Sequence, residues 1–283
     1  MQQFHNFCMV KNMKSDILSA PLPKWAKLPI NRCNLPAEII GSLGFQHDPR
    51  PLELDGVKEI HQDLFQKLDL LSNKEDRARQ FMDYMSVHFL LEDITRAGAT
   101  ETTKRKKATY LRLLRGWFFD SDGREAAVLK GWVESRFGLS PSYHNARISD
   151  KNSAAYIRFM KIRTEGVYST NALEAQLDLL YSYVQYELAL DKQSYTLYRG
   201  INRLEEFDIL RRDNKEEAVF LFNNLNSFST ERETASAFGD MILQVEVPKE
   251  KIMCCPGLFG NQFASEHEYM VLGGLYHTTM SYM

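Results

Sequence analysis

Two glutamates, Glu266 and Glu268, flank a single histidine in the segment FASEHEYMVL (263–272), close to the end of the 283-residue chain. The segment turns apolar and aromatic at this point, which is typical of a β-strand. Side chains alternate faces along a strand, so we expect both carboxylates on one face, roughly 6–7 Å apart, and His267 on the other. That separation leaves room for a sugar carbon and an incoming group, as between the paired carboxylates that flank a scissile glycosidic bond. An isolated pair of glutamates two positions apart more often belongs to a solvated surface strand. Whether this pair is part of an active site therefore depends on the other motifs of the chain.

A second candidate is the arginine in TLYRG (196–200), where Arg199 ends a strand-like stretch and Gly200 follows at once. A guanidinium presents a planar fork of donors that suits a phosphate. Glycine allows a ligand to approach the backbone closely. The alternative interpretation is a surface arginine before a turn.

The third candidate is a pair of hydroxyl residues, Ser229 and Thr230, in NSFSTERETASAFG (226–239). They follow an apolar strand and precede a short helix whose first turn is acidic. Either hydroxyl can cap that helix, and the acidic residues suit its dipole. Alternatively, Ser229 points inward and holds a catalytic carboxylate while Thr230 caps the helix. The two interpretations are compatible.

Periodicity divides the elements that must position these residues into three parts. Residues 20–54 are rich in proline and turn residues, and we expect residues 1–54 to form an extended N-terminal wrap. Residues 55–190 are predicted to be helical and residues 191–283 to be β-rich, and the whole is expected to form one compact unit. Apolar spacing and capping patterns predict helices over 57–71, 72–93, 108–119, 124–138, 153–165 and 171–188. Strand patterns cover 194–200, 218–225, 241–247 and 267–277, with a short helix over 233–239.

Composition excludes several classes of protein. The net charge is −2, so no strong positive field is available for nucleic acid, and the basic run at 103–107 indicates a solvated helix start. No apolar run approaches the length of about 18 residues that a membrane span requires, and no secretory signal is evident. We therefore expect a cytoplasmic protein. Its four cysteines are expected to be reduced thiols, and no paired ligand spacing supports a zinc site; they are Cys8, Cys33, Cys254 and Cys255.

The order of the three motifs resembles the arginine–serine–glutamate class of mono-ADP-ribosyltransferases. A closer resemblance is to the NAD-dependent dinitrogenase reductase ADP-ribosyltransferases of nitrogen-fixing bacteria. It is carried by LPINRCNLPAEIIGSLGFQHDPRPLELDGV (28–57), by LYRGIN (197–202) and by the glutamate-containing segment FASEHEYMVLGGLYH (263–277). The serine motif of this class commonly reads S-T-S. In this chain its third residue is Glu231 instead of serine, at a position that is peripheral in the class.

The resemblance implies an α/β (α+β) fold in which two small mixed β-sheets form a cleft for NAD, with NAD as substrate and no metal. Glu268 would stabilise the positive charge that develops on the ribose, and Ser229 would orient Glu268. Glu266 would prepare an acceptor arginine, whose guanidinium is otherwise protonated and a poor nucleophile. The residues expected to bind NAD are Arg199, Gly200, Ser229, Thr230, Phe238 and Glu268.

Aromatic residues near these motifs have two interpretations each. Phe238 follows the serine motif and either stacks on nicotinamide or belongs to the core. Phe259 and Phe263 lie in CCPGLFGNQFAS (254–265), a loop that glycines make a candidate for mobility. They either contact the protein acceptor or pack in the interior.

By the same resemblance, the acceptor is the homodimeric iron protein of nitrogenase, modified on an arginine so that nitrogen fixation is reversibly inactivated. A PII-type nitrogen signalling protein is an expected regulator. Three alternatives stay open: an arginine-directed transferase with another bacterial target, a catalytically silent module that senses NAD, and a toxin. Intact arginine, serine and glutamate motifs disfavour the silent module, and the lack of an export signal disfavours the toxin.

Overall fold

The computed structural model describes residues 21–91, 109–166, 170–191, 194–259 and 267–282. In the order of the chain, the helices before the first strand are η1 (Lys24–Ala26), α2 (Ala37–Ile40), α3 (Leu43–His47), α4 (Val57–Ile60), α5 (Gln62–Asp69), α6 (Lys74–His88), α7 (Tyr110–Phe119), α8 (Arg124–Phe137), α9 (Ala154–Gly166) and α10 (Thr170–Ala189). The remaining elements are β1 (Ser194–Ile201), η2 (Leu204–Glu206), β2 (Asp208–Arg212), β3 (Glu217–Ser229), α11 (Arg232–Ser236), β4 (Met241–Pro248), η3 (Lys249–Lys251), β5 (Ile252–Cys254) and β6 (Glu268–Tyr282). The predicted α+β fold is confirmed.

Most predicted helices are present within two or three residues of their expected ends, and the exceptions have local causes. The helix expected over 72–93 ends at His88, just before Leu90 takes a positive φ of 51°. The helix expected over 57–71 is two helices, α4 and α5, because His61 leaves the helical region between them with φ −109° and ψ 28°. The start of α6 is capped by Asn73, whose side-chain oxygen accepts from the Asp76 N–H at 2.7 Å. The N-terminal segment predicted to be extended contains the short helices α2 and α3. The basic run at 103–107 and Cys8 lie outside the described residues.

The strands form one sheet of order β2-β3-β1-β4-β6-β5, in which β3 also pairs with β6, so the sheet curls back on itself. Every pairing between described strands is antiparallel, which differs from the two mixed sheets that were expected. The register brings the three motifs to one point. Ser229 lies opposite Tyr198 of β1 and opposite Glu268 of β6.

Two glycines allow backbones to approach where side chains would collide. A Cβ on Gly273 of β6 would lie 1.8 Å from the carbonyl oxygen of Asn223, at the bulge of β3. A Cβ on Gly200 would lie 2.0 Å from the carbonyl oxygen of Ala235, so α11 rests directly on β1. The Gly200 position was expected to admit a ligand, and the structure gives it a packing role as well.

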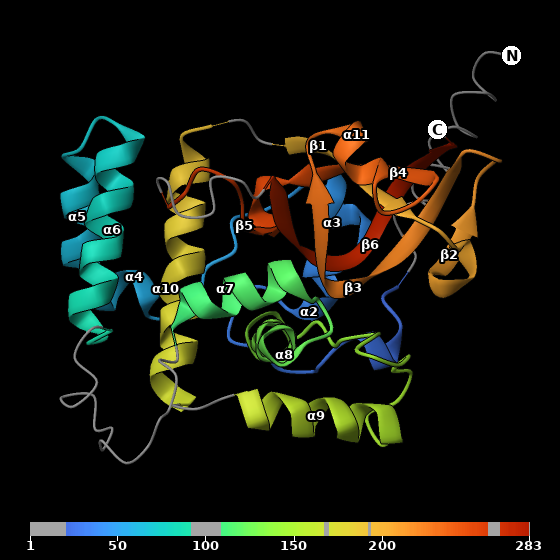
Figure 1. Cartoon of the computed structure of the whole chain (residues 1–283), viewed down its shortest axis with the longest axis horizontal. Helices are drawn as coiled ribbons and strands as arrows, with labels where there is room; N and C mark the ends of the chain where they lie inside the picture. Colours follow the sequence, from blue (N-terminus) through green and yellow to red (C-terminus); the bar gives the residue numbers. More distant parts are fainter. Residues whose placement is uncertain (1–20, 92–108, 167–169, 192–193, 260–266, 283) are drawn as a thin grey trace, which may run out of the picture.

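Helices from the middle of the chain pack against the sheet. In Figure 1, α7 and α8 lie beside the strands, and α10 stands between them and the α5–α6 pair. Asn224, in the bulge of β3, donates to the carbonyl oxygens of Lys130 in α8 and of Leu139, at 2.7 and 3.0 Å. One hydrophobic core contains residues of the N-terminal segment, the helices and the strands alike. The helical part is therefore held against the sheet on the side where the motifs meet.

No helix in the described part of the chain is long and apolar enough to cross a membrane. Cys33, Cys254 and Cys255 are buried free thiols, as predicted.

Candidate active site

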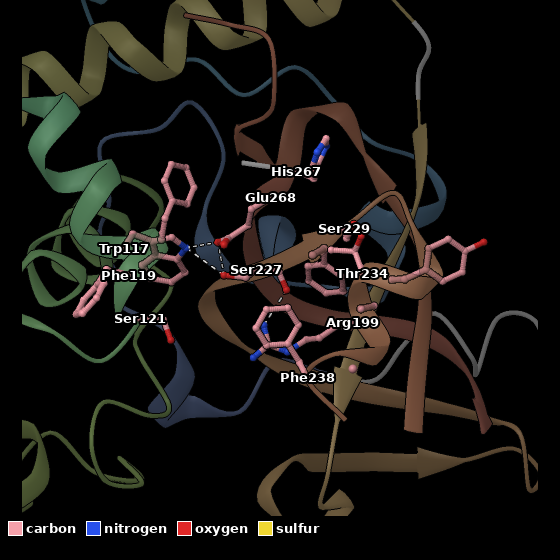
Figure 2. A pocket seen from close by; sticks show the side chains of 15 residues that line it. Trp117, Phe119, Ser121, Arg199, Ser227, Ser229, Thr234, Phe238, His267 and Glu268 are labelled. Atoms are coloured by element: carbon pink, nitrogen blue, oxygen red, sulfur yellow. Dashed lines mark hydrogen bonds between the residues drawn. The ribbon is translucent and has the colours of Figure 1, made fainter. Parts of the chain in front are cut away.

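A cavity of about 370 Å³ opens where α7, β1, the end of β3, α11 and the start of β6 meet (Figure 2). Residues of all three sequence motifs line it, together with aromatic residues of the helical part. The lining consists of Trp117, Phe118, Phe119, Ser121, Tyr198, Arg199, Gly200, Ser227, Phe228, Ser229, Thr234, Ala235, Phe238, His267 and Glu268.

The Glu268 carboxylate is half-buried and accepts two hydrogen bonds on the same oxygen. The Trp117 indole Nε1 lies 2.6 Å from Glu268 Oε1, and the Ser227 hydroxyl donates to the same atom (Figure 2). The indole Nε1 is also 3.1 Å from Ser227 Oγ, so the three groups form a closed triangle. Hydrogen bonds to a carboxylate are charge-assisted and strong, and this arrangement fixes where the carboxylate sits.

The hydroxyl that contacts Glu268 belongs to Ser227, whereas Ser229 was predicted to make that contact. Ser229 Oγ accepts instead from the backbone N–H of Glu231 at 3.0 Å, in the turn that leads into α11. The physical reason is that residues two apart share a face of a strand, so both hydroxyls point toward the cavity. The turn before α11 engages one, and the carboxylate engages the other.

Thr230 is exposed and does not line the cavity. The N-cap position of α11 is occupied by Glu231, and no side chain caps the helix there. The expectation that Ser229 or Thr230 caps this helix is therefore wrong.

Arg199 points into the cavity from β1, and its guanidinium is hydrogen-bonded to the backbone of β3. Its Nη1 donates to the Ser227 carbonyl oxygen at 2.8 Å. Its Nε is buried and has no partner among the described residues. Burial lowers the pKa of the guanidinium, while the nearby Glu268 and Asp122 carboxylates oppose that shift. A buried N–H donor on a cation is costly unless it is paired, and an anionic group of a ligand would satisfy it.

The aromatic residues divide by exposure. Phe238 is 70% exposed at the cavity, so the alternative that it belongs to the core is wrong. Phe119, at the end of α7, is 94% exposed and lines the same cavity. Phe259 is only 2% exposed and packs against Tyr110 with ring centroids 6.0 Å apart, so it cannot contact an acceptor protein. Phe263 lies outside the described residues.

Only one member of the glutamate pair can be placed. Glu266 lies outside the described residues, so the prediction that it shares a face with Glu268 stays a prediction. His267 was expected on the face opposite Glu268, but it is exposed and lines the same cavity as Glu268.

A second cavity, of about 540 Å³, adjoins the first and shares Trp117, Ser121, Arg199 and Ser227 with it. Buried Lys130 lies against it, and its Nζ donates to Asp122 at 2.9 Å and to the Tyr143 carbonyl oxygen at 3.1 Å. Burial lowers the pKa of Lys130, and burial beside Lys130 lowers the pKa of His144 to about 4. His144 is therefore neutral near pH 7.

No cluster of three or more potential metal ligands occurs in the part of the chain that the structure describes.

Sequence reasoning missed Trp117, Ser227 and Phe119. Trp117 lies on the apolar face of a helix, a pattern that reads as ordinary core packing. Ser227 had one usable signal, because it stands two residues before Ser229 and therefore on the same face of β3.

An α+β fold that gathers an arginine, a serine hydroxyl and a strand-borne glutamate in one cavity has the arrangement expected of a mono-ADP-ribosyltransferase. Residues 30–280 match the family described as dinitrogenase reductase ADP-ribosyltransferase (DRAT), and the chain belongs to this family. It is 36% identical over 261 residues to the NAD(+)–dinitrogen-reductase ADP-D-ribosyltransferase of Rhodospirillum rubrum, across 89% of this chain and 95% of that protein. No solved structure matched the chain. The resemblance inferred from the motifs is confirmed.

Proposed function

We propose that this protein is an NAD-dependent mono-ADP-ribosyltransferase that modifies an arginine of dinitrogenase reductase and so reversibly inactivates nitrogen fixation. Membership of the family and the name of the Rhodospirillum rubrum relative support this activity. The single observation that carries the chemistry is the Glu268 carboxylate, held by Trp117 and Ser227 in the same cavity as Arg199.

The two cavities adjoin and share Arg199, so NAD in this proposal extends across both of them. The nicotinamide riboside would occupy the first, with Phe238 free to stack on the nicotinamide ring. Arg199 stands where the cavities join, and its buried Nε would donate to a phosphate oxygen. The ADP part would extend into the second cavity.

The reaction requires positive charge on the ribose to be stabilised while the glycosidic bond breaks. When the bond between nicotinamide N1 and ribose C1′ breaks, its electron pair stays on nicotinamide, which leaves as a neutral molecule. Glu268, already fixed by two donors, would stabilise the cationic ribose without reorganising. An arginine nitrogen of the acceptor then bonds to C1′ and loses its proton to Glu266.

The acceptor in this proposal is the dinitrogenase reductase homodimer, in the cytoplasm, with a PII-type protein as a regulator. The direct test incubates the purified protein with dinitrogenase reductase and NAD labelled in its ADP-ribose part, and maps any modified residue. We expect label on an arginine, and no label with Glu268→Gln. Label on lysine would contradict the proposal. NAD hydrolysis without transfer would point to another acceptor, and NAD binding without turnover would point to a silent module.

A further inference from the structure

The carboxylate of Glu268 is held from two sides of the molecule. Ser227 reaches it from the neighbouring strand β3, whereas Trp117 reaches it from α7 in the helical part, 151 positions earlier in the chain. The indole nitrogen is a donor only, and its ring is 2% exposed. Its distance of 2.6 Å to Oε1 is short for an N–H donor.

We propose that Trp117 is a positioning residue for the catalytic carboxylate, so that the helical part completes the active site of the β-rich part. This inference rests on the proposed function of Glu268. Electrostatic stabilisation works best when the charged group is already in place before the reaction. Two donors on Oε1 from independent elements restrict the carboxylate more than a single flexible hydroxyl would.

The position of the Trp117 ring is itself fixed by a contact with a buried lysine. The Lys130 ammonium lies 5.8 Å from the centroid of the Trp117 ring, within the range of a cation–π contact. Lys130 is in turn held by Asp122 and by the Tyr143 carbonyl oxygen, and its own backbone carbonyl accepts from Asn224 of β3. The Trp117 ring therefore contacts a fixed ammonium group as well as the carboxylate, which limits its rotation.

The test exploits a matched tryptophan. Trp132 is fully buried in α8, and its Nε1 donates to Asp178 at 2.7 Å, outside both cavities. Trp117→Phe and Trp132→Phe each remove one indole N–H bond to a carboxylate and keep an aromatic ring. We expect Trp117→Phe to lower kcat for NAD hydrolysis roughly ten- to a hundredfold, with KM for NAD within about twofold. Trp132→Phe should keep kcat, even where both variants lower the melting temperature.

A double-mutant cycle separates positioning from general damage. In a Glu268→Gln background, Trp117→Phe should cost less than about threefold more, because the group through which it acts is already gone. An equal loss in both backgrounds, or a wild-type kcat for Trp117→Phe, would overturn the proposal.

A readout independent of turnover uses the indole ¹⁵N–¹H resonances of the three tryptophans. The resonance lost in Trp117→Phe should shift in Glu268→Gln, while that of Trp132 should not. An unmoved Trp117 resonance would overturn the proposal. A wild-type protein that consumes no NAD would instead contradict the proposed function, so the two failures are distinct.

Discussion

Ser229 lies directly opposite Glu268 in the β3–β6 register, yet its hydroxyl does not contact the Glu268 carboxylate. The Ser229 Oγ accepts a hydrogen bond from the Glu231 N–H instead. The Glu268 carboxylate accepts from the hydroxyl of Ser227, which precedes Ser229 by two residues on β3. The residue opposite Glu268 in the register is thus not the serine that contacts its carboxylate, and the two serines are expected to respond differently to substitution.

Ser227→Ala should lower kcat for NAD hydrolysis more than Ser229→Ala does. The first removes a donor to the Glu268 carboxylate, and we expect a loss of roughly tenfold or more. The second removes an acceptor for one backbone N–H in the turn before α11, which should cost about 1 kcal/mol of stability. Steady-state kinetics and melting temperatures of both variants decide the matter. A larger kinetic loss for Ser229→Ala would show that the two serines exchange roles when NAD binds.

Glu268→Gln and Glu266→Gln should separate two functions. Losing the Glu268 charge should lower both transfer and NAD hydrolysis by about 10²–10³-fold, since both pass through the cationic ribose. Glu266→Gln should abolish transfer to arginine while hydrolysis continues, because water needs less help to attack so reactive a cation. Both changes are nearly isosteric, so unchanged melting temperatures serve as the control. Equal loss of hydrolysis in the two variants would refute this division.

Phe238→Ala should impair NAD binding, whereas Phe259→Ala should lower the stability of the fold. Phe238 is exposed at the cavity, so its truncation should raise KM for NAD several-fold and leave the melting temperature nearly unchanged. Phe259 is buried in the core, so its truncation should cost about 3–5 kcal/mol of stability. Kinetics at a temperature where both variants are folded distinguishes the cases. An unaltered KM in Phe238→Ala would exclude the stacking role.

Lys251→Met should stabilise the protein in a pH-dependent way. Lys251 is buried beside the Phe45 and Tyr276 rings, and burial lowers its pKa from 10.5 to about 7. Between these values the unfolded chain binds a proton that the folded chain does not, so this lysine makes stability rise with pH. At and below pH 7 both states are protonated, and the cost of the buried charge is constant.

The methionine variant removes that cost and also the hydrogen bond from Lys251 to the Gly273 carbonyl oxygen. We expect a net gain of about 2 kcal/mol near pH 6.5, which shrinks toward zero as the pH approaches 10. Denaturant unfolding at several pH values measures it. A gain that is independent of pH would show that Lys251 does not titrate in this range.

From the sequence alone came the class of chemistry, the family and the run of helices followed by strands. The helices and strands followed from local rules, since the 3.6-residue and two-residue periods are properties of short segments. The chemistry and the family followed from the resemblance that the ordered motifs around Arg199, Ser229 and Glu268 carry. The short edge strands β2 and β5 escaped, because strands of five and three residues carry little periodic signal.

Only the tertiary structure decided which side chains touch Glu268. The indole of Trp117 reaches the carboxylate because Asn224 and the bulge of β3 hold α8, and with it α7, against the sheet. The tertiary structure also decided exposure: the sequence left a site role and a core role open for both Phe238 and Phe259, yet Phe238 faces the cavity and Phe259 the core. A contact across 151 positions depends on how whole elements pack, and no local pattern of residues records it.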